Sequence, residues 1–156
     1  MEDPYLESLI VEKRLYKEWK EHKGVIIFVD FDNTVYDFYQ EGHTHQKVLK
    51  LLKECQDLGC TIGVFTCRGE KDYDTIVAYF NLFGITIKYI NTSPEPVKHV
   101  SLSNKVYYNI LLDDRAGLEA AYKALLNVKT KIVGESQHCD DGGDVFRCMN
   151  CTKFGG

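Results

Sequence analysis

The chain has 156 residues, 44% of them hydrophobic and 27% charged, with a formal net charge of -4 and an isoelectric point of about 5.7. These values are typical of one soluble globular domain with an ordinary core. They exclude an overall basic surface of the kind that attracts nucleic acid or anionic membranes. The N-terminal sequence is acidic and has no secretion-signal pattern, and no stretch is apolar enough to span a membrane. We therefore expect a cytoplasmic protein without membrane contact.

The first half of the chain predicts two helices and two strands. Apolar residues at helical spacing predict a helix over residues 4–23. Residues 25–29 (VIIFV) are apolar without interruption, which is typical of a strand at the centre of a sheet. A short flap or hairpin is expected over residues 35–43, followed by a helix over residues 47–57 and a second strand over residues 61–65.

The second half continues this alternation. It predicts a helix over residues 70–83, strands over residues 85–90 and 106–112, a helix over residues 118–126 and a final strand over residues 129–133. Strands that alternate with helices of this length favour a mainly parallel sheet. We therefore expect an α/β fold with three layers, in which a doubly wound sheet is covered by helices on both faces.

Polar residues follow several of the predicted strands at their carboxyl ends. Asp30 and Asp32 follow the first strand, Thr66 follows the second, and Asp113 and Asp114 follow the strand over residues 106–112. Open α/β sheets bind ligands at this edge. Clustered carboxylates suit Mg²⁺, and hydroxyl and ammonium groups suit phosphate oxygens, so the pattern indicates phosphoryl transfer. The simpler interpretation of the residues after the first strand is an ordinary turn.

Four segments in this order carry a resemblance to a known family. They are VDFDNTV at residues 29–35, IGVFT at 62–66, Lys105, and ILLDD at 110–114. They resemble the four motifs of haloacid-dehalogenase-type (HAD) phosphohydrolases, and TCRGE and KVYYNILLDDRA look like small members without a cap domain. The resemblance covers roughly residues 25–115, and its specificity comes from the order and context of the motifs.

The resemblance implies roles for the first two carboxylates. Asp30 would be the nucleophile that forms an aspartyl-phosphate. Asp32 would protonate the leaving oxygen and then deprotonate the attacking water. Dehalogenase members of the superfamily lack the second carboxylate, so the presence of Asp32 points to a phosphatase or a phosphotransferase.

The resemblance also implies ligands for phosphate and metal. Thr66 and Lys105 would hold the phosphoryl oxygens, with Lys98 as the alternative lysine. Arg68 is a further candidate for contact with the substrate phosphate, although a solvated arginine at a helix start would look the same.

Magnesium would be bound at the same edge of the sheet. Its ligands would be the carboxylates of Asp30 and Asp113 and the main-chain carbonyl of Asp32, with Asp114 supporting the metal or a bound water.

The C-terminal segment is the second informative region. We expect a phosphatase core with its N-terminal helix over residues 1–135 and a cysteine- and histidine-bearing tail over residues 136–156. The tail offers enough ligands for one tetrahedral zinc site, a zinc knuckle. These ligands are His138, Cys139, Cys148 and Cys151. The alternative is a flexible tail. The six cysteines are read as thiols or metal ligands rather than disulfides.

Two functions are compatible with these features. Residues 34–66 are too few for a separate cap domain, so the site should be open. The first function is a Mg²⁺-dependent phosphatase that acts on a nucleotide or another small phosphorylated metabolite, and the negative net charge favours it. The alternative is a nucleic-acid end phosphatase that uses the tail to bind its substrate, and the open site favours it.

Overall fold

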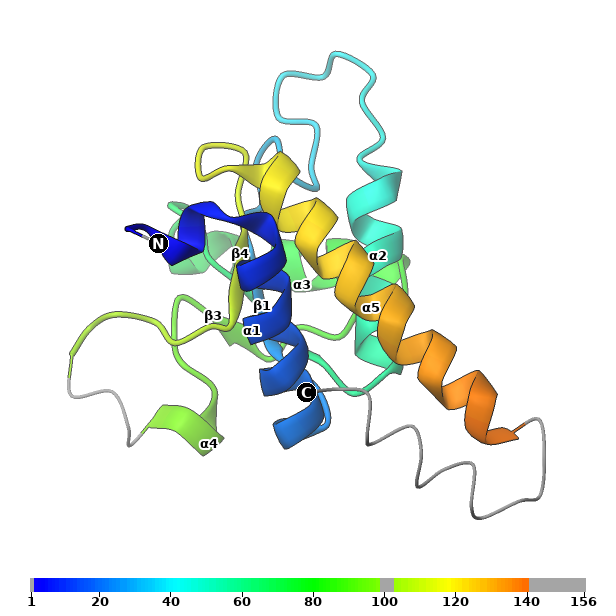
Figure 1. Ribbon diagram of the computed structural model, residues 1–156. Helices are drawn as coiled ribbons and strands as arrows, with labels where there is room; N and C mark the ends of the chain where they lie inside the picture. The colour runs from blue at the N-terminus through cyan, green and yellow to red at the C-terminus, as the bar shows by residue number, and fades with distance from the viewer. Residues whose placement is uncertain (1, 99–102, 141–156) are drawn as a thin grey trace.

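The computed structural model of the chain describes residues 2–98 and 103–140, in which four strands form one all-parallel sheet (Figure 1). The strands are β1 Ile26–Val29, β2 Thr61–Val64, β3 Tyr89–Ile90 and β4 Ile110–Leu112. Their order in the sheet is β3-β2-β1-β4. The strands therefore progress in one direction from β1 to β3 and then return to the other side of β1. This reversal is the topological switch point of an open α/β sheet.

Helices connect and flank the strands. They are α1 Ser8–His22, α2 Gln46–Asp57, α3 Tyr73–Leu82, α4 Glu95–Lys98 and α5 Leu118–Asp140, with 3₁₀ turns at Pro4–Leu6 and Glu70–Asp72. The connection from β1 to β2 contains α2, and the connection from β2 to β3 contains α3. Along the β4 side of the molecule, α1 packs against α5 (Figure 1).

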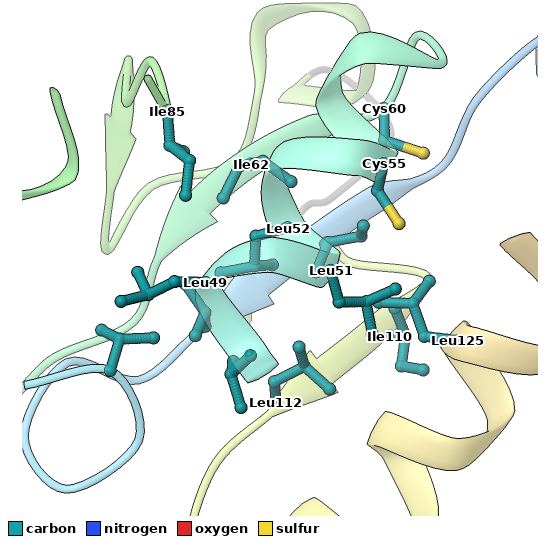
Figure 2. Close-up of a cluster of buried hydrophobic side chains, with 14 of the residues drawn as sticks. Leu49, Leu51, Leu52, Cys55, Cys60, Ile62, Ile85, Ile110, Leu112 and Leu125 are labelled. Carbon is teal, nitrogen blue, oxygen red and sulfur yellow. The ribbon is translucent and has the colours of Figure 1, made fainter. Parts of the chain in front are cut away.

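The strand register explains why the sheet is buried. Ile27 pairs with Ile62 and Ile110, and Val29 pairs with Val64 and Leu112. Since paired residues of parallel strands face the same side, these apolar side chains form one continuous face. They belong to the main hydrophobic core together with side chains of α2, α3 and α5. Figure 2 shows Leu49, Leu51 and Leu52 of α2 in one cluster with residues of β2 and β4.

The opposite face depends on close contact between β1 and β2. Phe28 is fully buried, and its ring lies 6.3 Å from that of Tyr108. A Cβ added at Gly63, its register partner, would lie only 2.5 Å from the Phe28 ring. A glycine is therefore required beside Phe28.

The structure corrects one predicted element. Residues 129–133 are not a strand but part of α5, which continues to Asp140. The apolar residues Leu125, Val128 and Ile132 keep the helical spacing, and all three pack in or against the core. The end of the helix is fastened to α1, because Tyr16 and Lys20 both bond to Glu135. The expected boundary between residues 135 and 136 therefore falls inside a helix.

Other elements are shorter than predicted. The expected strands over residues 85–90 and 106–112 reduce to β3 and β4. Ile85 and Val106 are buried nonetheless, so their apolar character reflects packing rather than strand pairing. The expected flap over residues 35–43 contains no paired strands beyond a single bridge between Asp32 and Tyr36.

The sheet confirms the α/β class and the parallel arrangement. The division into three layers stays a prediction, because the connection from β3 to β4 includes residues 99–102, which lie outside the described part. Within the described ranges, no helix combines the length and the apolar character that a membrane crossing requires.

Candidate functional site

The carboxyl ends of β1 and β4 bring three carboxylates together. Asp30 follows β1 directly, and Asp113 and Asp114 follow β4. The Asp30 N–H donates to the Leu112 carbonyl at 2.9 Å, so the pairing of the two strands continues to the edge where the aspartates begin. Carboxylate oxygens of Asp30, Asp113 and Asp114 lie within 4.8 Å of one another. The site therefore lies at the switch point of the sheet.

A buried threonine links the two strand ends. The Thr34 hydroxyl oxygen accepts the Asp114 N–H at 3.0 Å. It also lies 3.2 Å from Asp30 Oδ2 and 3.3 Å from Asp114 Oδ1, so its single proton can serve either carboxylate. Thr34 is fully buried, which keeps this bridge away from water. Thr34 therefore fixes the position of the Asp30 carboxylate, after β1, relative to that of Asp114, after β4.

The carboxylates interact unfavourably when all are ionised. Burial, the hydrogen bond with Asp114 and the charge of Asp113 raise the pKa of Asp30 to about 7, although the Thr34 hydroxyl acts in the opposite direction. A cation would remove this repulsion. Three closely spaced carboxylate oxygens are also the hard ligands that Mg²⁺ prefers, so these residues fit a magnesium ion.

The Asp32 side chain has a different environment. Arg68 Nε donates to Asp32 Oδ2 at 2.9 Å, and Arg68 Nη2 donates to Asp32 Oδ1 at 2.6 Å. The guanidinium carbon lies 5.0 Å from the centre of the Phe31 ring and 5.4 Å from that of Tyr36. The hydrogen bond to Asp32 raises the pKa of Arg68 above its ordinary value. Asp32 therefore stands apart from the three-carboxylate group and is held by an arginine.

Thr66 is held by an asparagine that follows β3. The Thr66 N–H donates to Asn91 Oδ1 at 2.8 Å, and Asn91 Nδ2 donates to the Thr66 carbonyl at 2.7 Å. The same amide nitrogen lies 3.2 Å from the Tyr73 hydroxyl. The Thr66 hydroxyl oxygen accepts the Arg68 N–H at 3.1 Å, which leaves its proton available for a ligand oxygen.

Reasoning from the sequence did not identify Thr34 as a bridge between the strand ends or Asn91 as the residue that holds Thr66. The sequence signal for Asn91 was its place directly after a predicted strand. In the structure it adopts a positive φ of 54°, a conformation that asparagine tolerates better than most residues. That φ is visible only in the structure. For Thr34, the signal was its place in the first motif.

Two lysines were predicted as candidates for phosphate binding. Lys105 is exposed and lies in the segment before β4. That segment is tied to the loop after β3, because the Tyr107 N–H donates to Ser93 Oγ at 2.9 Å. Lys98 lies in α4, but its side chain is outside the described set.

The predicted zinc ligands cannot be placed together. The main chain of His138 and Cys139 belongs to the last turn of α5, and their side chains are outside the described set, as are Cys148 and Cys151 altogether. Of the cysteines within the described ranges, Cys55, Cys60 and Cys67 are free thiols, as expected. The zinc site therefore stays a prediction.

A separate cavity of about 350 Å³ opens near the amino ends of β2 and β3. Its lining includes Thr61, Thr86, Lys88 and Tyr89 but none of the predicted site residues. It therefore lies away from the carboxylates.

Comparisons with known proteins add information about the fold alone. Neither a protein-family model nor a curated protein sequence matches the chain. A solved structure, described as the conserved protein coded by locus from Bacteroides thetaiotaomicron, is similar with a TM-score of 0.53 and 20% sequence identity. The match covers 67% of this chain and 91% of that chain. At this identity it supports the α/β architecture with its parallel sheet and carries no information on activity.

Proposed function

We propose that the chain is a Mg²⁺-dependent phosphatase of the HAD type, which hydrolyses a phosphomonoester of a nucleotide or another small metabolite. One observation carries the proposal. Asp30 lies at the switch point in a group with Asp113 and Asp114, while Asp32, two residues later, is held separately by Arg68. One carboxylate beside a metal site and a second one outside it is the division of labour that a nucleophile and an acid–base group need.

The first step transfers the phosphoryl group to the protein. An Asp30 carboxylate oxygen attacks phosphorus, and the bond between phosphorus and the ester oxygen breaks. Asp32 in its protonated form gives its proton to that oxygen, so the leaving group departs as an alcohol. The Thr66 hydroxyl donates to a phosphoryl oxygen, and Lys105, or Lys98 in its place, supplies an ammonium group to another.

The second step releases phosphate. Asp32, now ionised, takes a proton from a water molecule that attacks phosphorus, and the bond between Asp30 and phosphorus breaks. Magnesium, when bound by Asp30, Asp113 and the Asp32 carbonyl with support from Asp114, supplies positive charge that stabilises the phosphoryl oxygens.

A nucleic-acid terminus is the alternative substrate. The loop that follows β1 projects from the body of the molecule (Figure 1), and it exposes Phe38 and Tyr39, whose rings lie 5.1 Å apart. Exposed aromatic rings stack on bases without regard to sequence. The negative net charge weakens the attraction to a phosphate backbone, so the small substrate remains the first proposal.

A substrate panel tests the proposal. Phosphate release is measured from nucleotides, sugar phosphates, an aryl phosphate and 5′- or 3′-phosphorylated oligonucleotides, with Mg²⁺ or with a chelator. We expect release from at least one small ester with Mg²⁺ and none with the chelator. Asp3→Asn, a change of an exposed aspartate near the N-terminus, is the control and should retain the activity. Release from oligonucleotides alone would favour the alternative, and no release from any member would refute both functions.

A further inference from the structure

We propose that Arg68 is a positioning residue for Asp32 and does not bind the substrate phosphate. This inference rests on the proposed phosphatase function and changes the role that the sequence suggested for Arg68. It follows from what the guanidinium contacts on each of its sides.

The guanidinium edge of Arg68 that could bind a phosphate is already hydrogen-bonded to Asp32. Its Nε and Nη2 atoms donate to the two Asp32 oxygens at 2.9 and 2.6 Å. This paired geometry is the one in which arginine also binds a phosphate group. To bind phosphate through the same edge, Arg68 would have to release Asp32. The two side chains are only 24% and 28% exposed, so water competes weakly for this pair.

Aromatic rings fix the guanidinium from another direction. The Phe31 and Tyr36 rings stack with centres 5.0 Å apart and planes at 9°, and the guanidinium lies over both. Tyr79 meets each ring edge-on, and its hydroxyl donates to the Val35 carbonyl at 2.6 Å. A planar guanidinium stacks on such rings, whereas a lysine ammonium cannot both stack and form the paired hydrogen bonds.

The main chain holds the base of the same side chain. The Arg68 N–H donates to the Thr66 hydroxyl, and Thr66 is itself clamped by Asn91. Arg68 is thus fixed at its backbone, its face and its hydrogen-bonding edge. A carboxyl group with both oxygens held by such a partner has one orientation, and proton transfer to a leaving group depends on orientation. Without Arg68, the Asp32 carboxyl would rotate.

The test separates positioning from phosphate binding. Arg68→Gln and Arg68→Lys are compared with the control Lys71→Gln, which removes an exposed cation in the adjacent 3₁₀ turn. The rate of leaving-group release is measured in single turnovers for an alkyl phosphate and for an aryl phosphate. The alkyl ester needs a proton on its leaving oxygen, whereas an aryl ester with an acidic phenol does not. Inhibition by inorganic phosphate is measured in parallel.

We expect both Arg68 variants to slow alkyl release by about tenfold or more, within the range for general-acid catalysis, and to slow aryl release much less. Inhibition by inorganic phosphate and the KM values should change little. An equal loss for both esters, accompanied by weaker phosphate inhibition, would show that Arg68 binds phosphate and would overturn the inference.

A double-mutant cycle checks that Arg68 acts through Asp32. In the Asp32→Asn background, Arg68→Gln should cause no further loss of alkyl release, because the group that it positions is gone. Losses that multiply would contradict the inference. If the Arg68 variants do not fold, Tyr36→Leu removes a ring beneath the guanidinium and should slow alkyl release selectively, while Tyr36→Phe keeps the ring and should not.

The outcomes also separate this inference from the proposed function. An active wild-type protein with unaffected Arg68 and Tyr36 variants would refute the positioning role and leave the phosphatase intact. A wild-type protein that releases no phosphate from any substrate would refute both.

Discussion

The Asp30 carboxyl has a raised pKa of about 7, against an ordinary value of 3.8, so its ionised form is disfavoured in the folded protein without a cation. Below the ordinary value, both the folded and the unfolded states are protonated, and the group has no effect on stability. As the pH rises toward 7, the unfolded state loses its proton while the folded state keeps it. The contribution of Asp30 to stability therefore becomes more unfavourable through this window and stays so above it.

This sign gives a prediction for Asp30→Asn. The amide cannot act as a nucleophile, so phosphatase activity should be lost. The metal-free variant should nonetheless be more stable than the wild type above pH 7, because it lacks the carboxylate that is disfavoured in the folded state. We expect a difference of only about 1–2 kcal/mol, because solvent partly screens the half-buried site. Thermal unfolding with a chelator, at pH values between 4 and 8, measures the difference, which should grow with pH. A variant that is less stable at pH 8, or one with wild-type turnover, would contradict the role of Asp30.

Asp32→Asn should separate metal binding from catalysis. Its side chain lies outside the group of Asp30, Asp113 and Asp114, so Mg²⁺ affinity should be largely kept. Turnover at saturating Mg²⁺ should fall by roughly two to four powers of ten, the usual loss for a general acid. Calorimetric titration with Mg²⁺ and steady-state kinetics provide the two values. Loss of metal binding with an unchanged saturated rate would be the opposite of this prediction.

At this scale, the sequence located the carboxylates but not their partners. Asp30, Asp113 and Asp114 were predicted to meet because each follows a strand of one parallel sheet. The pairing of Asp32 with Arg68 joins residues 36 positions apart, and it depends on the course of the loop after β2 and on the rings of Phe31 and Tyr36. Local spacing contains no information on such a contact.

At the scale of elements, Asn91 connects the end of β3 to the end of β2. Its side chain accepts a hydrogen bond from the Thr66 N–H and donates one to the Thr66 carbonyl. These two bonds stand in for main-chain hydrogen bonds beyond the end of the β2–β3 pairing. Asn91→Ala should remove both bonds and place alanine at a positive φ. We expect a loss of about 1–3 kcal/mol in stability together with reduced turnover.

Asn91→Gly is the matched control, because glycine accepts the positive φ but lacks the amide. It should recover part of the lost stability without recovering turnover, as measured by chemical unfolding and phosphate release. Recovery of full turnover in Asn91→Gly would show that backbone conformation, and not the clamp on Thr66, is what the site needs.

Predicted elements failed where short apolar runs had two interpretations. KTKIV, residues 129–133, alternates like a strand, yet the helix that begins at Leu118 continues through it and packs on α1. A run of five residues cannot show which neighbour it will contact. Conversely, the runs over residues 25–29 and 61–65 were long and apolar enough to be central strands, and they became β1 and β2.

At the scale of the whole molecule, alternation of strands and helices predicted a parallel α/β sheet but not its strand order. The strand order depends on which edge of the growing sheet each crossover connection reaches. The return of β4 to the free side of β1 is therefore a property of the complete chain. That return creates the site, since it brings Asp113 beside Asp30.

The C-terminal segment gives a separate prediction. If His138, Cys139, Cys148 and Cys151 bind zinc, purified protein should contain close to one equivalent of the metal, since structural zinc contributes about 10 kcal/mol or more to folding in small modules. Cys148→Ser combined with Cys151→Ser should release it and leave hydrolysis of a small generic ester unchanged. Cys67→Ser, which changes an exposed thiol outside the C-terminal segment, is the control. Elemental analysis that finds no zinc in protein prepared without chelators would refute the prediction.

The central claim is that Asp30 is phosphorylated during turnover, and trapping that intermediate tests it most directly. Asp32→Asn is mixed with Mg²⁺ and an aryl phosphate, whose leaving group needs no proton, and is quenched in acid for mass spectrometry. The first step should proceed while the second stalls without its base, so one phosphoryl group should accumulate and map to Asp30. Protein that also carries Asp30→Asn should remain unmodified. A phosphoryl group on another residue, or release of the phenol with no modified protein at any time, would contradict the account.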